Sequence, residues 1–257
     1  MAQPTDTFDL AQYALHHVQN AREWHLPFGI RIPLPEHLSL HTVMLLIASG
    51  IMILLFTVFY RKNQRVPRGL TNLLEAFVVF VRDEIAGQVL GKEEGRKFTP
   101  LLCTFFFFIL VLNLLGMIPV FATATANISV TAALAFVTLC VIVFGAIRKN
   151  GIKGFARAFI PSGVPLLILI FLVPMEFLGL FIKSFALMIR LFANMFGGHL
   201  VFFSIVGLVG SFGIVALPVI MLSTFVYLLE ILVAFLQAYI FTLLSAVFIA
   251  QFHYPEH

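Results

Sequence analysis

The C-terminal part of the chain is almost free of charge. Only four charged residues occur between Ala158 and Pro255, and no polar loop divides the two long apolar stretches at about 165–209 and 212–252. Each stretch holds about 40–45 residues and would extend about 60–68 Å as an α-helix. A helix needs about 20 apolar residues to cross the ~30 Å hydrocarbon core of a bilayer. Stretches of this length and composition therefore predict a membrane protein.

The composition of the whole chain leads to the same class. Of 257 residues, 61% are hydrophobic and 11% are charged, whereas a soluble domain has about 25% charged residues. A water-soluble enzyme, a disordered protein and a disulfide scaffold are excluded. The net charge of +4 fits basic cytoplasmic loops better than a nucleic-acid partner, which we do not expect. Cys103 and Cys140 match no metal or redox spacing.

Hydropathy divides the chain into membrane spans. We predict an all-α polytopic protein with about five transmembrane helices and one amphipathic surface helix. The expected segments are an N-terminal non-cytoplasmic segment at 1–37, a first transmembrane helix at 38–60, the surface helix at 67–91, a transmembrane hairpin at 98–149 and a long helical hairpin at 160–252. Residues Arg148–Arg157 are expected to form a short basic loop.

The two last stretches allow two arrangements. Each could contain two short spans, or each could be one steeply tilted helix, the two forming a hairpin. We prefer the hairpin, because no polar loop interrupts either stretch.

Orientation follows from the distribution of Lys and Arg. Residues 61–97 hold eight of them and residues 148–157 hold four. Basic loops face the cytoplasm, which places the N-terminus outside and the C-terminus on the cytoplasmic side. We find no secretory signal in the first 37 residues. His16, His17 and His25 show no metal-ligand spacing, and we expect no metal site.

The four charges of the C-terminal part follow a helical repeat. Glu176, Lys183 and Arg190 are seven residues apart and Asn194 follows four residues later, so all four fall on one stripe of a helix. His199 lies roughly on the opposite face. A charge at membrane depth costs at least about 2.5–3.5 kcal/mol and by default indicates an ion pathway.

The last stretch has a polar stripe of its own. Ser223, Glu230 and Gln237 are seven residues apart, with the Tyr227 hydroxyl nearby. Glu and His can gain and release protons, whereas Arg keeps its charge in proteins. The pattern therefore indicates a proton path interrupted by a fixed positive charge, with Glu176 toward the basic side and His199 and Glu230 toward the other.

Two other functions compete with this interpretation. A secondary transporter or antiporter could use Arg190 to bind an anionic substrate, but such proteins usually contain internal repeats, and we find none. A passive membrane scaffold would not require the four buried charges for ion flux.

Three motifs resemble a known family. The run MEFLGLFIKSFALMIRLFANMFGGHL from Met175, the run EILVAFLQAYIF from Glu230 and the run LNLLGMIP from Leu112 are similar to subunit a of the rotary F-type ATP synthase. The resemblance covers most of the chain from about Leu38 to His253. It implies two aqueous half-channels beside a rotating ring of c subunits, each of which carries a membrane-embedded carboxylate.

The resemblance also implies roles for individual residues. Arg190 matches the essential arginine, which attracts an ionised ring carboxylate and blocks a direct leak between the half-channels. Asn194 and Gln237 match its polar neighbours, Glu230 and His199 match the inlet, and Glu176 matches an acidic position at the outlet. Accessory candidates are Lys183, Ser223, Tyr227 and Asn113. The role of Lys183 is open between an ion pair with Glu176 and a reach toward lipid headgroups.

The resemblance finally implies partners and a location. The c-subunit ring, the b-subunit peripheral stalk, other ATP synthase subunits and the lipid bilayer are the expected partners. The chain would not be an enzyme on its own, and we expect no cofactor. In many bacterial members the His199 and Glu230 residue types are reversed, whereas mitochondrial members and some bacteria have the present order. We favour a bacterial inner membrane over a mitochondrial one.

Overall fold

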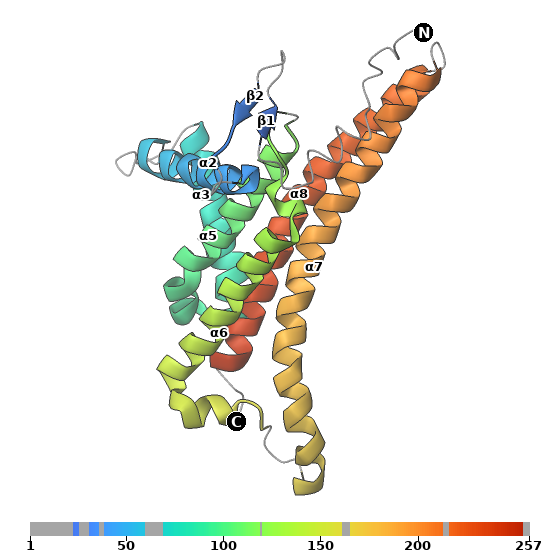
Figure 1. The fold of residues 1–257 in the computed structure, drawn as a ribbon. Coiled ribbons are helices and arrows are strands. Elements are labelled where there is room, and N and C mark those ends of the chain that lie inside the picture. Colours follow the sequence, from blue (N-terminus) through green and yellow to red (C-terminus); the bar gives the residue numbers. More distant parts are fainter. Residues whose placement is uncertain are drawn as a thin grey trace.

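The structure is a computed structural model that describes residues 23–25, 31–35, 39–59, 69–118, 120–160, 165–212 and 216–253. Helices dominate it (Figure 1). The elements in chain order are β1 (Glu23–His25), β2 (Arg31–Pro33), α2 (Leu40–Leu54), η2 (Leu55–Phe59), α3 (Leu70–Phe80), η3 (Val81–Gly87), α4 (Gln88–Leu90), α5 (Lys92–Gly116), η4 (Ala124–Ala126), α6 (Ile128–Arg157), α7 (Leu166–Phe212) and α8 (Ala216–His253). His16, His17 and the basic residues at 61–68 lie outside the described residues.

Five helical segments are long and apolar enough to cross a membrane. They comprise Leu40–Val58, Lys92–Gly116, Ile128–Arg157, Leu167–Phe202 and Leu217–His253. The predicted class, an all-α polytopic membrane protein with about five spans, is confirmed. The short antiparallel pair of β1 and β2, which pairs Trp24 with Ile32, has no counterpart among the predicted elements.

The two C-terminal stretches form one long helix each. The helix α7 has 47 residues and α8 has 38, and the two run antiparallel beside each other (Figure 1). Pro174 lies inside α7 without ending it. The alternative of two short spans in each stretch is excluded for the described residues. Both helices exceed the ~30 Å hydrocarbon thickness, because each residue adds about 1.5 Å.

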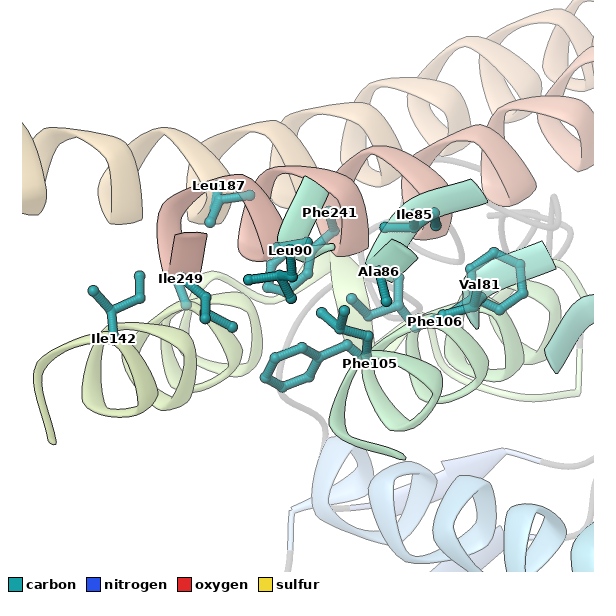
Figure 2. Close-up of a cluster of buried hydrophobic side chains, with 14 of the residues drawn as sticks. Val81, Ile85, Ala86, Leu90, Phe105, Phe106, Ile142, Leu187, Phe241 and Ile249 are labelled. Carbon is teal, nitrogen blue, oxygen red and sulfur yellow. The ribbon is translucent and has the colours of Figure 1, made fainter. Parts of the chain in front are cut away.

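A hydrophobic core fixes α7 and α8 to the shorter helices. Figure 2 shows Leu187 of α7 and Phe241 and Ile249 of α8 facing side chains from α5, α6 and η3. Phe106 of α5 is completely buried there and packs edge-to-face on Phe235 of α8, with ring centroids 5.7 Å apart. Such aromatic contacts add about 0.5–1.5 kcal/mol each to the burial of area. This core holds the polar faces of α7 and α8 in register.

The helical run α3–η3–α4 corresponds to the expected surface helix. Leu74 and Ile85 are buried against the bundle, whereas Leu70 and Leu73 are half exposed. The exposed Asp83 accepts two hydrogen bonds from the Arg82 guanidinium, at 2.7 and 2.8 Å. These bonds lower the pKa of Asp83, so the carboxylate is ionised at neutral pH.

The basic segment 148–157 is not the loop that the sequence suggested. The helix α6 extends through it to Arg157, interrupted only at Gly151, where φ is 70° and ψ is 172°. Glycine adopts this conformation readily, since it has no Cβ. The chain therefore bends at Gly151 and continues as helix. The basic side chains are on a helix end rather than on irregular backbone.

The N-terminal strands contact the connection between α5 and α6. The indole Nε1–H of Trp24 donates a 2.8 Å hydrogen bond to the carbonyl of Val120, and its ring lies 6.1 Å from that of Phe121. Trp24 of β1 thus packs at the end of the bundle where α5 gives way to α6.

Candidate functional site

The first group of ionisable side chains is a buried pair between α7 and α8. His199 Nδ1 lies 2.7 Å from Glu230 Oε1, and both side chains are less than a tenth exposed. Burial away from water would raise the free energy of either charge if it were present without the other. At this distance one proton can be shared, so that the pair is either imidazolium with carboxylate or neutral imidazole with neutral carboxyl. With this one proton the pair is neutral overall in either form, and both Nδ1 and Oε1 are atoms that can hold the proton.

The second nitrogen of His199 is held by the α5–α6 connection. His199 Nε2 lies 2.7 Å from Thr123 Oγ1 and 2.9 Å from the carbonyl oxygen of Gly116. Thr123 Oγ1 also donates to that carbonyl, at 3.2 Å, so the hydroxyl oxygen accepts from the imidazole. Nε2 therefore carries a hydrogen, and Nδ1 is the nitrogen that faces Glu230 Oε1.

A glycine of α7 lies directly against the carboxyl group of this pair. A Cβ added at Gly198 would lie 2.9 Å from Glu230 Oε1, whereas one added at Gly197 would meet no atom within 4 Å. Small residues at helix interfaces permit such approach in membranes. Gly198 is thus part of the site, while its neighbour Gly197 is not.

Amides form the second group. Asn194 Nδ2 of α7 donates a 3.1 Å hydrogen bond to Gln237 Oε1 of α8, and Asn113 Nδ2 of α5 donates to the carbonyl of Ala234 at 3.3 Å. Gln237 Nε2 and Asn113 Oδ1 are buried, and neither has a hydrogen-bond partner among the described residues. Buried polar atoms of this kind are normally satisfied by ordered water, which makes this region a candidate for hydration.

Arg190 differs from the groups around it. Its side chain is exposed, and it makes no hydrogen bond or ion pair with any part of the chain that the structure describes. It lies on α7 between the levels of Lys183 and Asn194, within a segment long and apolar enough to span a membrane. A guanidinium in that position is a fixed positive charge, and the described residues place no anion beside it.

The third group lies toward the C-terminal end of α8. Gln251 Nε2 donates to Glu176 Oε1 at 2.9 Å, and Lys183 Nζ donates to Gln251 Oε1 at 2.8 Å. Lys183 Nζ is also 3.9 Å from Glu176 Oε2. Of the two alternatives for Lys183, the structure shows the contact with Glu176. Gln251 was not predicted as a site residue, because nothing in its spacing relates it to residues on α7.

Two accessory candidates do not join these groups. The Ser223 hydroxyl donates to the carbonyl of Ile220 on its own helix, at 2.9 Å. Tyr227 packs against Met117, Met195 and Ala234. Gly116 at the end of α5 and Thr123 in the connection after it contact His199 and were not predicted. No charge or spacing in that segment pointed to them.

Ionisable and amide side chains thus occupy about 35 Å along α7, from Glu176 to His199, at 1.5 Å per residue. The fold and these residues define a multi-pass helical membrane protein with polar groups between its two longest helices. The family model described as ATP synthase A chain matches residues 42–250. The chain belongs to this family, as the sequence motifs predicted, and is a subunit of the ATP synthase rather than a secondary transporter.

Proteins named ATP synthase subunit a are similar to this chain over most of its length. The chain is 48% identical to ATP synthase subunit a of Chloroherpeton thalassium over 254 residues, which cover 93% of this chain and 75% of that one. It is 46% identical over 214 residues to subunit a of Anaeromyxobacter dehalogenans strain 2CP-C, covering 81% of this chain and 56% of the relative. It is 40% identical over 271 residues to that of Myxococcus xanthus, covering 94% and 88%.

Proposed function

We propose that the chain is the proton-conducting stator subunit of an F-type ATP synthase. It supplies two half-channels to a ring of c subunits and is held by the b-subunit stalk. Protons enter one half-channel, neutralise a ring carboxylate, travel with the ring and leave by the other. Proton flow is thereby coupled to rotation and to ATP synthesis in the catalytic sector. Since one charge crossing 100 mV yields only about 2.3 kcal/mol, several protons must be combined for each ATP.

The observation that carries this proposal is the contrast around Arg190. The carboxylates of Glu176 and Glu230 each have a cationic or ionisable partner within the chain, at 3.9 and 2.7 Å. Arg190 is exposed and has no such partner among the described residues. A cation within a membrane span is stabilised by pairing with an anion. An ionised ring carboxylate would supply this anion to Arg190.

The other groups take roles according to their contacts. The His199–Glu230 pair is the inlet relay, because two titratable atoms of opposite helices lie 2.7 Å apart there. Asn194 and Gln237 line the route toward Arg190, and Glu176 with Lys183 forms the outlet. Asn113 binds the backbone of α8 beside this route. Ser223 and Tyr227 stay on the inlet side as lining residues.

The location and orientation complete the proposal. The relatives named above are bacterial, and we place the chain in a bacterial inner membrane. The N-terminus is then outside and the C-terminus is cytoplasmic, so the outlet group at Glu176 faces the cytoplasm. The segments at 1–37, 38–60, 67–91, 98–149 and 160–252 are the corresponding topological units.

Cysteine cross-linking tests the predicted ring contact. Ala186 and Ala193 are exposed and lie one turn from Arg190 on α7. Ala186→Cys and Ala193→Cys are expected to form disulfides with cysteines on the outer helix of the c ring in assembled complexes, and Phe185→Cys, which is exposed on another face, serves as the control. Failure of both alanine positions to cross-link would contradict contact between this face and the ring.

A substitution at Gly198 tests the inlet relay. Gly198→Ala places a methyl group 2.9 Å from the resting position of Glu230 Oε1 and should displace the carboxyl group from His199. We expect ATP-driven proton pumping in inverted vesicles to fall about tenfold, since overpacking costs about 1–3 kcal/mol. Gly197→Ala, for which no atom lies within 4 Å of the new Cβ, should pump normally. Equal pumping by the two variants would contradict the relay geometry.

A further inference from the structure

The amide of Gln251 lies between the two charged side chains of the outlet group. It receives a hydrogen bond from Lys183 Nζ at 2.8 Å and gives one to Glu176 Oε1 at 2.9 Å. Glu176 and Lys183 come from α7, and Gln251 comes from the last turn of α8. All three side chains are partly buried. The contact therefore ties the end of α8 to both charges at once.

The chemistry of Lys183 sets the orientation of the amide. An ammonium group only donates hydrogen bonds, so the carbonyl oxygen of Gln251 must face Lys183. The NH₂ group then faces Glu176, which must accept through Oε1. The amide thus presents a donor to Glu176 and matches its carboxylate form.

The same amide lies between the two charges, whose ion pair is longer than a direct hydrogen bond. Lys183 Nζ and Glu176 Oε2 are 3.9 Å apart, whereas a direct charge-assisted hydrogen bond is about 2.7–2.9 Å long. Lys183 Nζ also lies over the rings of Phe248 and Phe252, 5.9 and 5.7 Å from their centroids. These contacts hold the ammonium group near the carboxylate and leave Glu176 Oε2 outside a short ion pair.

We propose that Gln251 is a positioning residue of the proton outlet. By holding Lys183 and Glu176 apart, it keeps a carboxylate oxygen of Glu176 available to receive a proton and release it to water. Without the amide, Lys183 would close onto Glu176 and occupy that oxygen. This inference rests on the outlet role of Glu176 in the proposed function. It adds a residue from α8 and gives Lys183 a defined task.

The test uses inverted membrane vesicles that contain the assembled ATP synthase, with ATP-driven proton pumping as the readout. Gln251→Leu removes both hydrogen bonds, and we expect pumping to fall about tenfold. Gln251→Met, which is unbranched and similar in length, should give the same loss and guards against a packing defect of the leucine variant. Immunoblotting of the membranes reports the amount of assembled subunit, by which the rates are normalised.

A matched control exists on the surface helix. Gln88 Nε2 also donates to a carboxylate, that of Glu84, at 2.5 Å, but this contact is exposed. Gln88→Leu makes the same chemical change outside the proposed outlet and should leave pumping within about twofold of the wild type, as is usual for exposed substitutions.

A double-mutant cycle separates positioning from a purely structural role. If Gln251 acts through Glu176, Gln251→Leu should cause no further loss in a Glu176→Gln background. Additive losses, or normal pumping by both Gln251 variants, would overturn the inference while Glu176 keeps its outlet role. Normal pumping by Glu176→Gln would instead reject the outlet assignment in the proposed function.

Discussion

Arg190→Ala is expected to abolish ATP-driven proton pumping while ATP hydrolysis by the catalytic sector continues. The variant removes the exposed cation of α7 that has no partner among the described residues, and with it the proposed attraction for an ionised ring carboxylate. We expect pumping in inverted vesicles to fall at least about a hundredfold, the usual loss when a preorganised electrostatic group is removed. The ratio of pumping to hydrolysis is the quantity to measure.

Two further variants show whether the position or merely the charge matters. Arg190→Lys keeps a cation but loses the planar guanidinium and its permanent protonation, so it should recover little pumping. Arg157→Ala removes an exposed arginine at the end of α6 and should pump normally. Pumping by Arg190→Ala at the level of Arg157→Ala would remove Arg190 from the mechanism.

Exchange of His199 and Glu230 is expected to preserve more activity than loss of either residue. His199→Ala or Glu230→Ala leaves one titratable group of the 2.7 Å pair without its partner, and pumping should fall about a hundredfold, as for a lost acid–base group. His199→Glu combined with Glu230→His keeps one acid and one imidazole at the contact. The exchanged protein should therefore exceed both single variants.

The exchange should nevertheless stay below the wild type. In the native arrangement His199 Nε2 faces the carbonyl oxygen of Gly116 at 2.9 Å. A carboxylate at position 199 would meet that acceptor without a hydrogen to donate. Initial pumping rates of the four proteins, normalised to assembled subunit, provide the comparison. If the exchange is no better than the single variants, the two residues do not act as a pair.

The sequence predicted the fold class because its signals are local. Long apolar stretches and the absence of polar loops are sufficient to predict five spans and two long C-terminal helices. The segment 148–157 was the error, since its charges suggested a loop. Charged residues can form the end of a helix where that end lies outside the apolar core. Gly151 provides a bend, after which α6 continues to Arg157.

Only some residues of the candidate site could be predicted from the sequence. A repeat of seven residues placed Glu176, Lys183 and Arg190 on one stripe, because helical periodicity is a local property. Contacts between elements have no such signature. Gln251 meets Glu176 across 75 positions of sequence and Thr123 meets His199 across 76, so only the packing of α8 and of the α5–α6 connection against α7 reveals them.

The central claim is that Arg190 is the barrier between the two half-channels. The most direct test measures proton flux into vesicles under an imposed membrane potential, with the ring held still by inhibition of the catalytic sector. Vesicles with the wild-type complex should be as tight as vesicles without it, whereas Arg190→Ala should leak protons through the stationary complex. An Arg190→Ala complex that is as tight as the wild type would contradict the claim.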